Sequence, residues 1–299
     1  MIFMKRHFVS VVIPTYNRGK KLSKTLESLI AQSYPKDGYE VIVVDDGSTD
    51  NTGEVVKEFR RKFKKFRYFK QENRGPAAAR NIGIKNSRGE IIAFTDDDCI
   101  VPRDWLDRLV ATYERFPDVV GVGGYIEARE DILKKNIFAQ YESYEARVIY
   151  GLGREVIFGG ADTPGMGTAN VSFKKQVLEE VGGFDEFFRS AAGEDMDLKK
   201  RIGEKGYKFV YIPLKVTHIQ DYSFRRFVIQ SWVRGLGSKY FDRKYRRKTF
   251  LESVVKIVFF PVILVYLILK NPFNWYHIKM NAVRTARMFI SSIARIVGG

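Results

Sequence analysis

The chain has 299 residues, of which 45% are hydrophobic, and a formal net charge of +16. This length and composition allow one large domain or two smaller ones and exclude wholesale disorder. A single cysteine, Cys99, excludes an intrachain disulfide, and the short segment before the first strand-like run is not expected to be a signal peptide.

The positive charge is concentrated at the C-terminal end. Residues 225–299 contain 15 Lys and Arg against 2 Asp and Glu, whereas residues 1–224 contain 36 against 33. A uniformly basic surface would indicate nucleic acid as a partner. A basic tail that also carries long apolar runs favours an anionic membrane surface instead.

Strand-like and helix-like segments alternate through the first half of the chain. The expected strands are 8–13, 41–44, 66–69 and 90–95. The expected helices are 19–32, 51–63, 76–85 and 103–116. Units of about thirty residues with this alternation predict an α/β fold with a mostly parallel sheet covered by helices.

The second half of the chain is less regular. We expect strands at 119–126, 170–173 and 207–212, and helices at 131–150 and 194–205. Residues 159–167 contain four glycines and a proline, which predicts a flexible loop able to act as a lid.

Polar clusters follow three of the expected strands, at residues 15–18, 45–46 and 96–98. Ligands of parallel sheets bind beyond the carboxyl ends of the strands, which is where these clusters fall. The cluster Asp96, Asp97 and Asp98 places like charges together, and a divalent cation such as Mg²⁺ or Mn²⁺ would remove their repulsion. An acidic turn that caps the next helix explains the three residues equally well.

Five segments in order resemble glycosyltransferase family 2, whose members are inverting enzymes of the GT-A fold. The resemblance covers residues 8–220 and is carried by 11–18, 43–50, 73–81, 96–98 and 182–198. It implies a Rossmann-like, mostly parallel central sheet flanked by helices. Residues 1–222 would form the catalytic domain, with a nucleotide-binding half at about 1–100 and an acceptor half at about 101–222.

The resemblance implies a donor site for a nucleoside-diphosphate sugar. Pro14 and Tyr16 would flank the nucleobase, Asp46 would hold the base or ribose, and Arg80 would contact the nucleotide or its phosphates. Each residue also has a purely structural explanation, as a turn, a packed loop aromatic or a solvated helix charge.

The resemblance also implies a site for Mn²⁺ or Mg²⁺. Asp96 and Asp98 match the family's Asp-x-Asp pattern, so Asp98 would bind the metal directly while Asp96 and Asp97 hold the ribose or metal-bound water. His218 would reach the metal or the diphosphate, although a satisfied histidine at a strand end is an equally good explanation. Cys99 is expected to be a small buried filler.

The acidic pair Glu194 and Asp195 matches the family's catalytic pair. Asp195 would be the base that removes the proton of the acceptor hydroxyl, and Glu194 and Asn170 would lie near the donor sugar or the acceptor. An acidic first helical turn, favoured by the helix dipole, is the structural alternative. Asp197 is expected to pair with Lys200 or Arg201.

Residues 223–299 are expected to associate with a membrane. They contain a basic aromatic helix at 224–241, thirteen uninterrupted apolar residues at 257–269, and from residue 280 an amphipathic helix with Arg284, Arg287 and Arg295 opposite its apolar face. The apolar run would extend about 20 Å as a helix, short of the roughly 30 Å of bilayer hydrocarbon. We therefore expect a monotopic protein, or one with a short C-terminal span, at the cytoplasmic face of the cell membrane; ordinary helix packing or a homo-oligomer interface is the alternative.

Together these features predict a metal-dependent inverting glycosyltransferase. Its acceptor would be a glycan, plausibly a lipid-linked saccharide or a polyprenyl phosphate. One alternative is a sugar-nucleotide nucleotidyltransferase, but the expected glycine-rich phosphate loop is absent after residue 13. The other is a basic nucleic-acid-binding protein, which the apolar tail argues against, so no nucleic-acid partner is expected.

Overall fold

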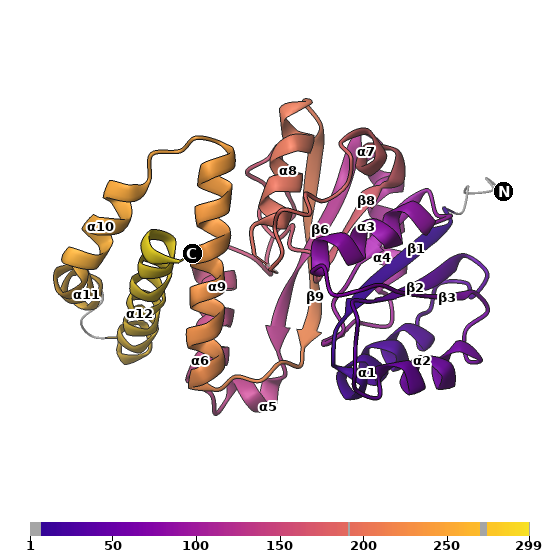
Figure 1. The fold of residues 1–299 in the computed structure, drawn as a ribbon, viewed down its shortest axis with the longest axis horizontal. Helices are drawn as coiled ribbons and strands as arrows, with labels where there is room; N and C mark the ends of the chain where they lie inside the picture. Colours follow the sequence, from indigo (N-terminus) through magenta and orange to yellow (C-terminus); the bar gives the residue numbers. More distant parts are fainter. Residues whose placement is uncertain (1–6, 191, 270–273, 299) are drawn as a thin grey trace.

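A nine-stranded sheet forms the centre of the protein in the computed structural model, which describes residues 7–190, 192–269 and 274–298 (Figure 1). The strands are β1 (Val9–Thr15), β2 (Tyr39–Asp45), β3 (Phe66–Lys70), β4 (Ile91–Phe94), β5 (Cys99–Ile100), β6 (Val119–Ala128), β7 (Ile157–Gly159), β8 (Val171–Lys174) and β9 (Lys208–His218). Their order is β3-β2-β1-β4-β8-β6-β9-β5, and β7 also pairs with β9. Strands β1 to β4 are parallel, β6 is parallel to β9, and β8 is antiparallel to both its neighbours. The predicted α/β fold with a mostly parallel sheet is confirmed.

Helices cover both faces of this sheet and form a further layer at its edge. They are α1 (Gly19–Ile30), α2 (Thr52–Arg60), α3 (Pro76–Asn86), α4 (Trp105–Arg115), α5 (Glu130–Leu133), α6 (Ile137–Tyr144), α7 (Lys175–Glu180), α8 (Glu194–Glu204), α9 (Phe224–Lys244), α10 (Phe250–Val258), α11 (Phe260–Leu269) and α12 (Trp275–Val297). A π-helical stretch, Glu145–Ile149, continues α6.

Alternate residues of β1 show how the sheet is buried on both faces. Val11 and Ile13 belong to a core cluster that α1, α2 and α4 complete, whereas Val12 belongs to a second cluster with α3, α7 and α8. All seven residues of β1 are buried, which explains why apolar residues occupy both faces of the strand rather than alternate positions. This two-sided burial fixes the strand ends, and therefore the polar residues that follow them.

Two expectations for the second half of the sheet need correction. The helix expected at 131–150 is interrupted, because the side chain of Asn136 accepts hydrogen bonds from the N–H groups of Phe138 and Ala139 and starts a new helix there. Strand β9 continues past residue 212 to His218, although Pro213 lacks an N–H. A register irregularity opposite Gly123 and Tyr125 accommodates the proline.

The apolar run at 257–269 does not form one continuous helix. The chain divides at Phe259 into α10 and α11, and Pro261 lies in the first turn of α11, where a proline needs no hydrogen-bond donor. Of the helices in the described ranges, none combines the length and the apolar character needed to cross a bilayer.

Two of the arginines predicted on the polar face of α12, Arg287 and Arg295, are paired within the protein. Arg287 is buried, where its Nη1 lies 2.8 Å from Oε2 of Glu145 and its guanidinium lies over the ring of Tyr141. Arg295 is paired with Asp242 of α9. Both face protein carboxylates rather than solvent because α12 packs along α9, which lies between α12 and the sheet (Figure 1).

Candidate active site

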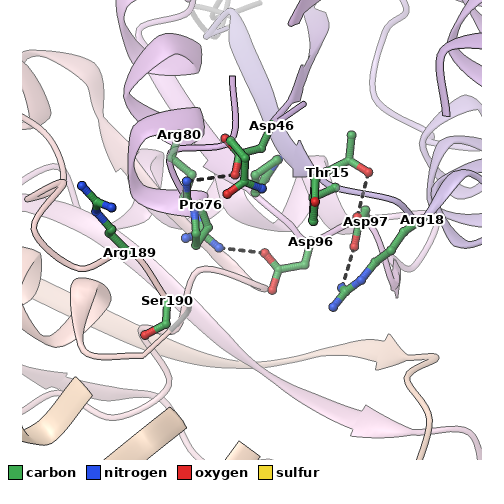
Figure 2. A pocket seen from close by; sticks show the side chains of 13 residues that line it. Thr15, Arg18, Asp46, Pro76, Arg80, Asp96, Asp97, Arg189 and Ser190 are labelled. Atoms are coloured by element: carbon green, nitrogen blue, oxygen red, sulfur yellow. Dashed lines mark hydrogen bonds and ion pairs between the residues drawn. The ribbon is translucent and has the colours of Figure 1, made fainter. Parts of the chain in front are cut away.

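A cavity of about 370 Å³ opens at the carboxyl ends of β1, β2 and β4 (Figure 2). All six residues predicted to bind the donor line it: Pro14, Tyr16, Asp46, Arg80, Asp96 and Asp97. Loops contribute further lining residues that sequence reasoning did not single out, among them Asn73, Arg189 and Ser190. The structure thus brings the predicted donor residues together, while their individual roles stay predictions.

The orientation of Asp46 is set by the loop that precedes α3. One carboxylate oxygen accepts hydrogen bonds from the Gln71 side chain and the Arg74 N–H, and the other accepts from the Gly75 N–H at 2.9 Å. The turn that follows Asp46 needs Gly47, whose φ is +90°. Asp46 is therefore a rigid acceptor group at the wall of the cavity.

The three consecutive aspartates have different partners. Asp97 is buried and accepts hydrogen bonds from Thr15 at 2.8 Å and from Arg18 at 2.9 Å. Burial raises the pKa of Asp97 to about 6, although the charge of Arg18 opposes the shift. Asp96 is more exposed and pairs with Arg80.

Asp98 is the aspartate with the most cationic surroundings. Its carboxylate lies 3.2 Å from Nε2 of His218, 3.1 Å from Nη1 of Arg18 and 3.6 Å from Nζ of Lys21. Burial alone would raise the pKa of Asp98, but the hydrogen bond and charge of His218, with Arg18 and Lys21, hold it well below its usual range. The Asp98 carboxylate is therefore anionic at neutral pH.

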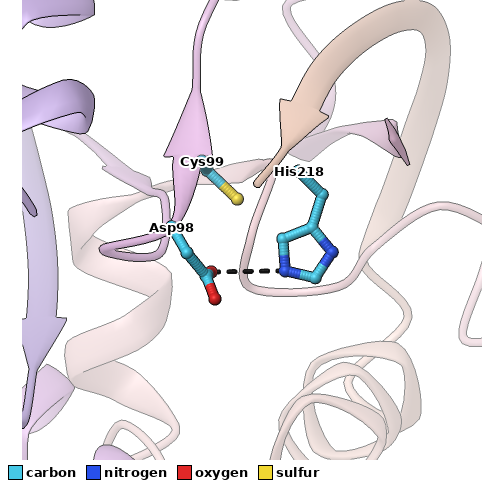
Figure 3. A group of neighbouring side chains, drawn as sticks. All are labelled: Asp98, Cys99 and His218. Atoms are coloured by element: carbon cyan, nitrogen blue, oxygen red, sulfur yellow. Dashed lines mark ion pairs between the residues drawn. The ribbon is translucent and has the colours of Figure 1, made fainter. Parts of the chain in front are cut away.

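Asp98, Cys99 and His218 form a cluster whose possible ligand atoms all lie within 4.8 Å of one another (Figure 3). Antiparallel pairing of β5 with β9 places Cys99 opposite His218. Burial, with the nearby aspartates, raises the pKa of the Cys99 thiol well above its ordinary value, so the thiol stays protonated and is a poor ligand. Nδ1 of His218 is buried without a hydrogen-bond partner in the described structure. A carboxylate and an imidazole remain, a donor set that fits Mn²⁺.

Asp195 is the second residue of α8, two positions after Gly193, whose φ of +93° allows the chain to turn into the helix. The Asp195 carboxylate is half-exposed and accepts a hydrogen bond from the Met196 N–H. It faces Gly167, where a Cβ atom would lie 3.7 Å from Oδ2. The absence of a side chain at Gly167 leaves space beside the carboxylate for a substrate hydroxyl.

The predicted lid is joined to the same helix. Lys199, one turn after Asp195, donates a hydrogen bond to the backbone carbonyl of Thr163 at 3.0 Å. Asp197 pairs with Arg201, as predicted, and also with Lys244 and the Tyr245 hydroxyl at the end of α9. Helix α8 is thus held by the loop on one side and by α9 on another.

Arg80 connects the acidic run to the helix of the predicted base. Its Nη1 lies 3.0 Å from Glu194 Oε1 and its Nη2 lies 2.9 Å from Asp96 Oδ1. Arg80 is only 2% exposed and Glu194 only 3%. Burial and the charge of Asp195 raise the pKa of Glu194 to about 8, while Arg80 opposes this shift. The guanidinium is thus engaged by two carboxylates, which favours positioning over the predicted direct phosphate contact.

The Asn170 side chain is buried, and its polar atoms are hydrogen-bonded within the protein. Its side-chain N–H groups donate to the backbone carbonyls of Tyr125 and Leu214, and its Oδ1 accepts from Trp105 Nε1 at 2.9 Å. These bonds join β8 to β6, β9 and α4. They give Asn170 a role in holding the sheet together, and because Asn170 also lines a small cavity, its contact with a sugar stays a prediction.

Helix α9 packs directly against the segment that leads into Asp195. A Cβ atom at Gly237 would overlap the carbonyl oxygen of Ala192, and a Cβ at Gly193 would lie 3.1 Å from the carbonyl oxygen of Gly237. Two residues earlier, a Cβ at Gly235 would overlap the carbonyl oxygen of Ser291 in α12. Two glycines therefore allow α9 to contact α12 and the base-bearing segment closely.

The chain belongs to glycosyltransferase family 2. The family model for glycosyl transferase family 2 matches residues 10–182, which include the acidic run and the residues that line the donor cavity except Arg189 and Ser190. Membership defines the protein as a glycosyltransferase and, among the three functions considered from the sequence, supports the first.

Curated relatives agree with this assignment. Glycosyltransferase AglE of Haloferax volcanii is 34% identical over 205 residues, which are 68% of this chain and 64% of that protein. The dolichyl N-acetyl-alpha-D-glucosaminyl phosphate 3-beta-D-2,3-diacetamido-2,3-dideoxy-beta-D-glucuronosyltransferase of Methanococcus voltae is 28% identical, over 80% of this chain and 75% of that protein.

Solved structures confirm the GT-A fold. Mannosyltransferase PcManGT from Pyrobaculum calidifontis, in complex with GDP-Man and Mn²⁺, superposes with a TM-score of 0.69 at 20% identity, covering 98% of this chain and 88% of that one. Residues 1–349 of TarS from S. aureus, in complex with UDP, give a TM-score of 0.55 at 17% identity, covering 96% and 90%.

Proposed function

We propose that the protein transfers a sugar from a nucleoside-diphosphate sugar to an acceptor hydroxyl, with inversion at the anomeric carbon and with Mn²⁺ or Mg²⁺ as cofactor. Three connected features carry this proposal: the Asp46 wall of the donor cavity, the Asp98–His218 pair, which Arg18 joins to that cavity, and Asp195. Arg80 joins Glu194, the neighbour of Asp195, to Asp96 at the cavity wall. PcManGT, which has the same fold, is described with GDP-Man and Mn²⁺, and TarS with UDP.

Each part of the site has a defined task in this reaction. Asp46 accepts hydrogen bonds from the base or ribose, and the half-exposed Tyr16 stacks on the base. Asp98 and His218 hold the cation, which would supply positive charge to the leaving diphosphate. Asp96 and Asp97 remain candidates for the ribose or for metal-bound water.

Asp195 performs the proton transfer. The acceptor oxygen forms a bond to the anomeric carbon while the bond from that carbon to the diphosphate oxygen breaks, and the hydroxyl proton moves to the Asp195 carboxylate. Attack from the face opposite the leaving group inverts the anomeric centre. Arg80 and Glu194 position the helix that carries the base.

The metal assignment is tested by cation-dependent thermal unfolding. In the presence of a nucleoside diphosphate, Mn²⁺ is expected to raise the Tm of the wild type, because a ligand at a hundred times its Kd stabilises the folded state by about 2.7 kcal/mol. Asp98→Ala and His218→Ala should lose the Mn²⁺-dependent part of this shift. Cys99→Ala is the matched control and should keep it, since the protonated thiol is not a ligand. Mn²⁺-dependent transfer that survives Asp98→Ala would contradict the assignment.

For the acceptor we propose a lipid-linked saccharide or a polyprenyl phosphate. The Methanococcus voltae relative is named for a dolichyl phosphate-linked sugar, and a Haloferax volcanii relative, 33% identical over 59% of this chain, is a glucosyl-dolichyl phosphate glucuronosyltransferase. A lipid-linked acceptor is also consistent with the surface of the tail.

We propose that this tail holds the enzyme on the cytoplasmic face of the cell membrane without crossing it. Large apolar side chains of α10 and α11 are exposed, including Leu251 at 71%, Val262 at 62% and Tyr266 at 63%. The basic residues 243–248 precede them and suit anionic headgroups. Residues 223–299 would then form a membrane-association region beside the catalytic domain.

Vesicle flotation tests the membrane proposal. The wild type should float with vesicles that contain phosphatidylglycerol and should be only partly released by salt, because apolar burial persists when charges are screened. The double variant Val262→Asp, Tyr266→Asp should lose most binding. Val156→Asp, at an exposed apolar residue outside the tail, is the control. Equal flotation of the wild type and the double variant would count against the proposed surface.

A further inference from the structure

A second cavity, of about 350 Å³, adjoins the donor cavity on the side of α9. The two cavities share Arg18, Asp96 and Ser190. The opposite wall of the second cavity, which we call the α9 cavity, is one face of helix α9. Its helical spacing is i, i+3, i+4, i+7 and i+8, with residues Arg226, Ile229, Gln230, Val233 and Arg234.

Charges in the α9 cavity are paired, with one exception. Asp98 is paired with Arg18 and His218, Asp96 is paired with Arg80, and Arg234 lies 3.1 Å from Glu145. Within the described part of the chain, the Arg226 side chain has neither an ion pair nor a hydrogen bond. A half-buried guanidinium therefore points to an anion supplied by a ligand.

The neighbours of Arg226 indicate what carries that anion. Arginine binds phosphate through several N–H donors at once, which suits a phosphate ester. Ile229 and Val233 follow on the same helix face, and Ile229 is 42% exposed. A phosphate next to an apolar wall matches a lipid phosphate better than a free sugar phosphate, because the wall would gain by covering a hydrocarbon chain.

We propose that the α9 cavity binds the phosphate of a polyprenyl phosphate-linked acceptor through Arg226, with Ile229 and Val233 against the first part of its hydrocarbon chain. This assignment rests on the proposed glycosyl transfer and specifies the acceptor half of that same site. Arg226 does not line the donor cavity, although the α9 cavity also includes Asp98 and His218, the residues proposed to hold the cation.

A third cavity provides room for the acceptor's sugar. It measures about 170 Å³ and shares Arg234 with the α9 cavity. Tyr125 and Tyr150 supply aromatic surface, and Gly167 places this cavity next to Asp195. A sugar joined to a phosphate at Arg226 can thus extend past Arg234 and present a hydroxyl to the base.

The test measures binding directly, by calorimetry, with farnesyl phosphate as the probe. The wild-type full chain should bind it, and Arg226→Ala should weaken binding at least tenfold while Arg226→Lys restores part of the loss. Arg225→Ala is the matched control, since it removes the same charge from the preceding, exposed position outside the cavity. Farnesol, which lacks the phosphate, should bind at least tenfold more weakly than farnesyl phosphate.

Two further arms separate the possible sources and sites of phosphate binding. Glucose 1-phosphate that binds as tightly as farnesyl phosphate would overturn the lipid assignment in favour of a soluble phosphate ester. A loss of GDP or UDP affinity in Arg226→Ala, with Mn²⁺ present, would place Arg226 in the donor site and overturn the proposal. Unchanged farnesyl phosphate binding in Arg226→Ala would overturn it as well. Nucleoside-diphosphate binding by the wild type reports on the proposed function separately, so failure of either can be told apart.

Discussion

Asp195→Asn is expected to lower the rate of sugar transfer by a factor of about 10²–10⁴, the usual contribution of a general base. The amide keeps the size of the carboxylate but cannot accept the proton of the acceptor hydroxyl. Donor affinity should stay near the wild-type value, because Asp195 lies beside Gly167 and does not line the donor cavity. The expected signature is therefore a fall in kcat with little change in the KM for the donor.

Steady-state transfer from a nucleoside-diphosphate sugar, together with calorimetric titration of the nucleoside diphosphate, checks this result. Glu204→Gln is a suitable control, since it makes the same kind of change at the far end of α8, where Glu204 pairs with Lys200 on the surface. A variant with full turnover, or one that loses donor affinity in proportion to its rate, would remove Asp195 from the role of base.

Arg80→Ala is expected to lower the free energy of unfolding by about 3–5 kcal/mol, the cost of removing one partner from a buried ion pair. Arg80 is almost fully buried and serves two carboxylates, so its removal leaves both Glu194 and Asp96 without their cation. The substitution should also reduce transfer, because the link between the acidic run and the helix of the base is lost.

The loss of stability in Arg80→Ala should depend on pH. Burial and Asp195 raise the pKa of Glu194 from 4.5 in the unfolded chain to about 8 in the fold. A group with a raised pKa contributes stability that is present below 4.5 and is lost as pH rises through about 8. Without Arg80 the pKa of Glu194 rises further, so the variant continues to lose stability above that pH. Its deficit relative to the wild type should therefore grow in alkaline solution.

Urea unfolding at several pH values between about 6 and 9 measures both effects, since the midpoint reports stability where the m-value is unchanged. Lys85→Ala is the control for removing a cation from the same helix, because Lys85 is exposed on α3. A deficit that stays constant or shrinks as pH rises would show that Glu194 is not the group left unpaired.

The donor half of the site could be predicted because its residues directly follow buried strands. Asp46 and Asp96 come after segments whose continuous apolar character already indicates two-sided burial, and parallel strands bring their carboxyl ends to one edge. Arg189 and Ser190 could not be found in this way, since they lie in a loop without periodicity. Likewise β5 has only two residues, too few for a pattern, although its pairing with β9 brings Cys99 opposite His218.

The tail shows a different limit of sequence patterns. The periodicity of α12 correctly indicates a helix with two unlike faces. It does not indicate that Arg287 pairs with a carboxylate, because Glu145 lies 142 positions away in the sequence. The periodicity therefore predicts that the charged face of α12 lies in solvent, although the ion pair with Glu145 buries Arg287. Long-range pairing of this kind appears only when the packing of α12 on α9 is known.

The two close glycine contacts of α9 have a consequence for how the tail can change. Gly235 places the backbone of α9 against α12, and Gly237 places it against the residues that lead into Asp195. A side chain at either position would push α9 away from the segment it contacts. At Gly237 that segment leads into Asp195 and therefore sets the position of the base. The C-terminal helices thus form one wall of the catalytic centre, because α9 packs against the segment that carries the base. A tail exchanged between relatives would keep the base in place only if both contact surfaces were exchanged with it.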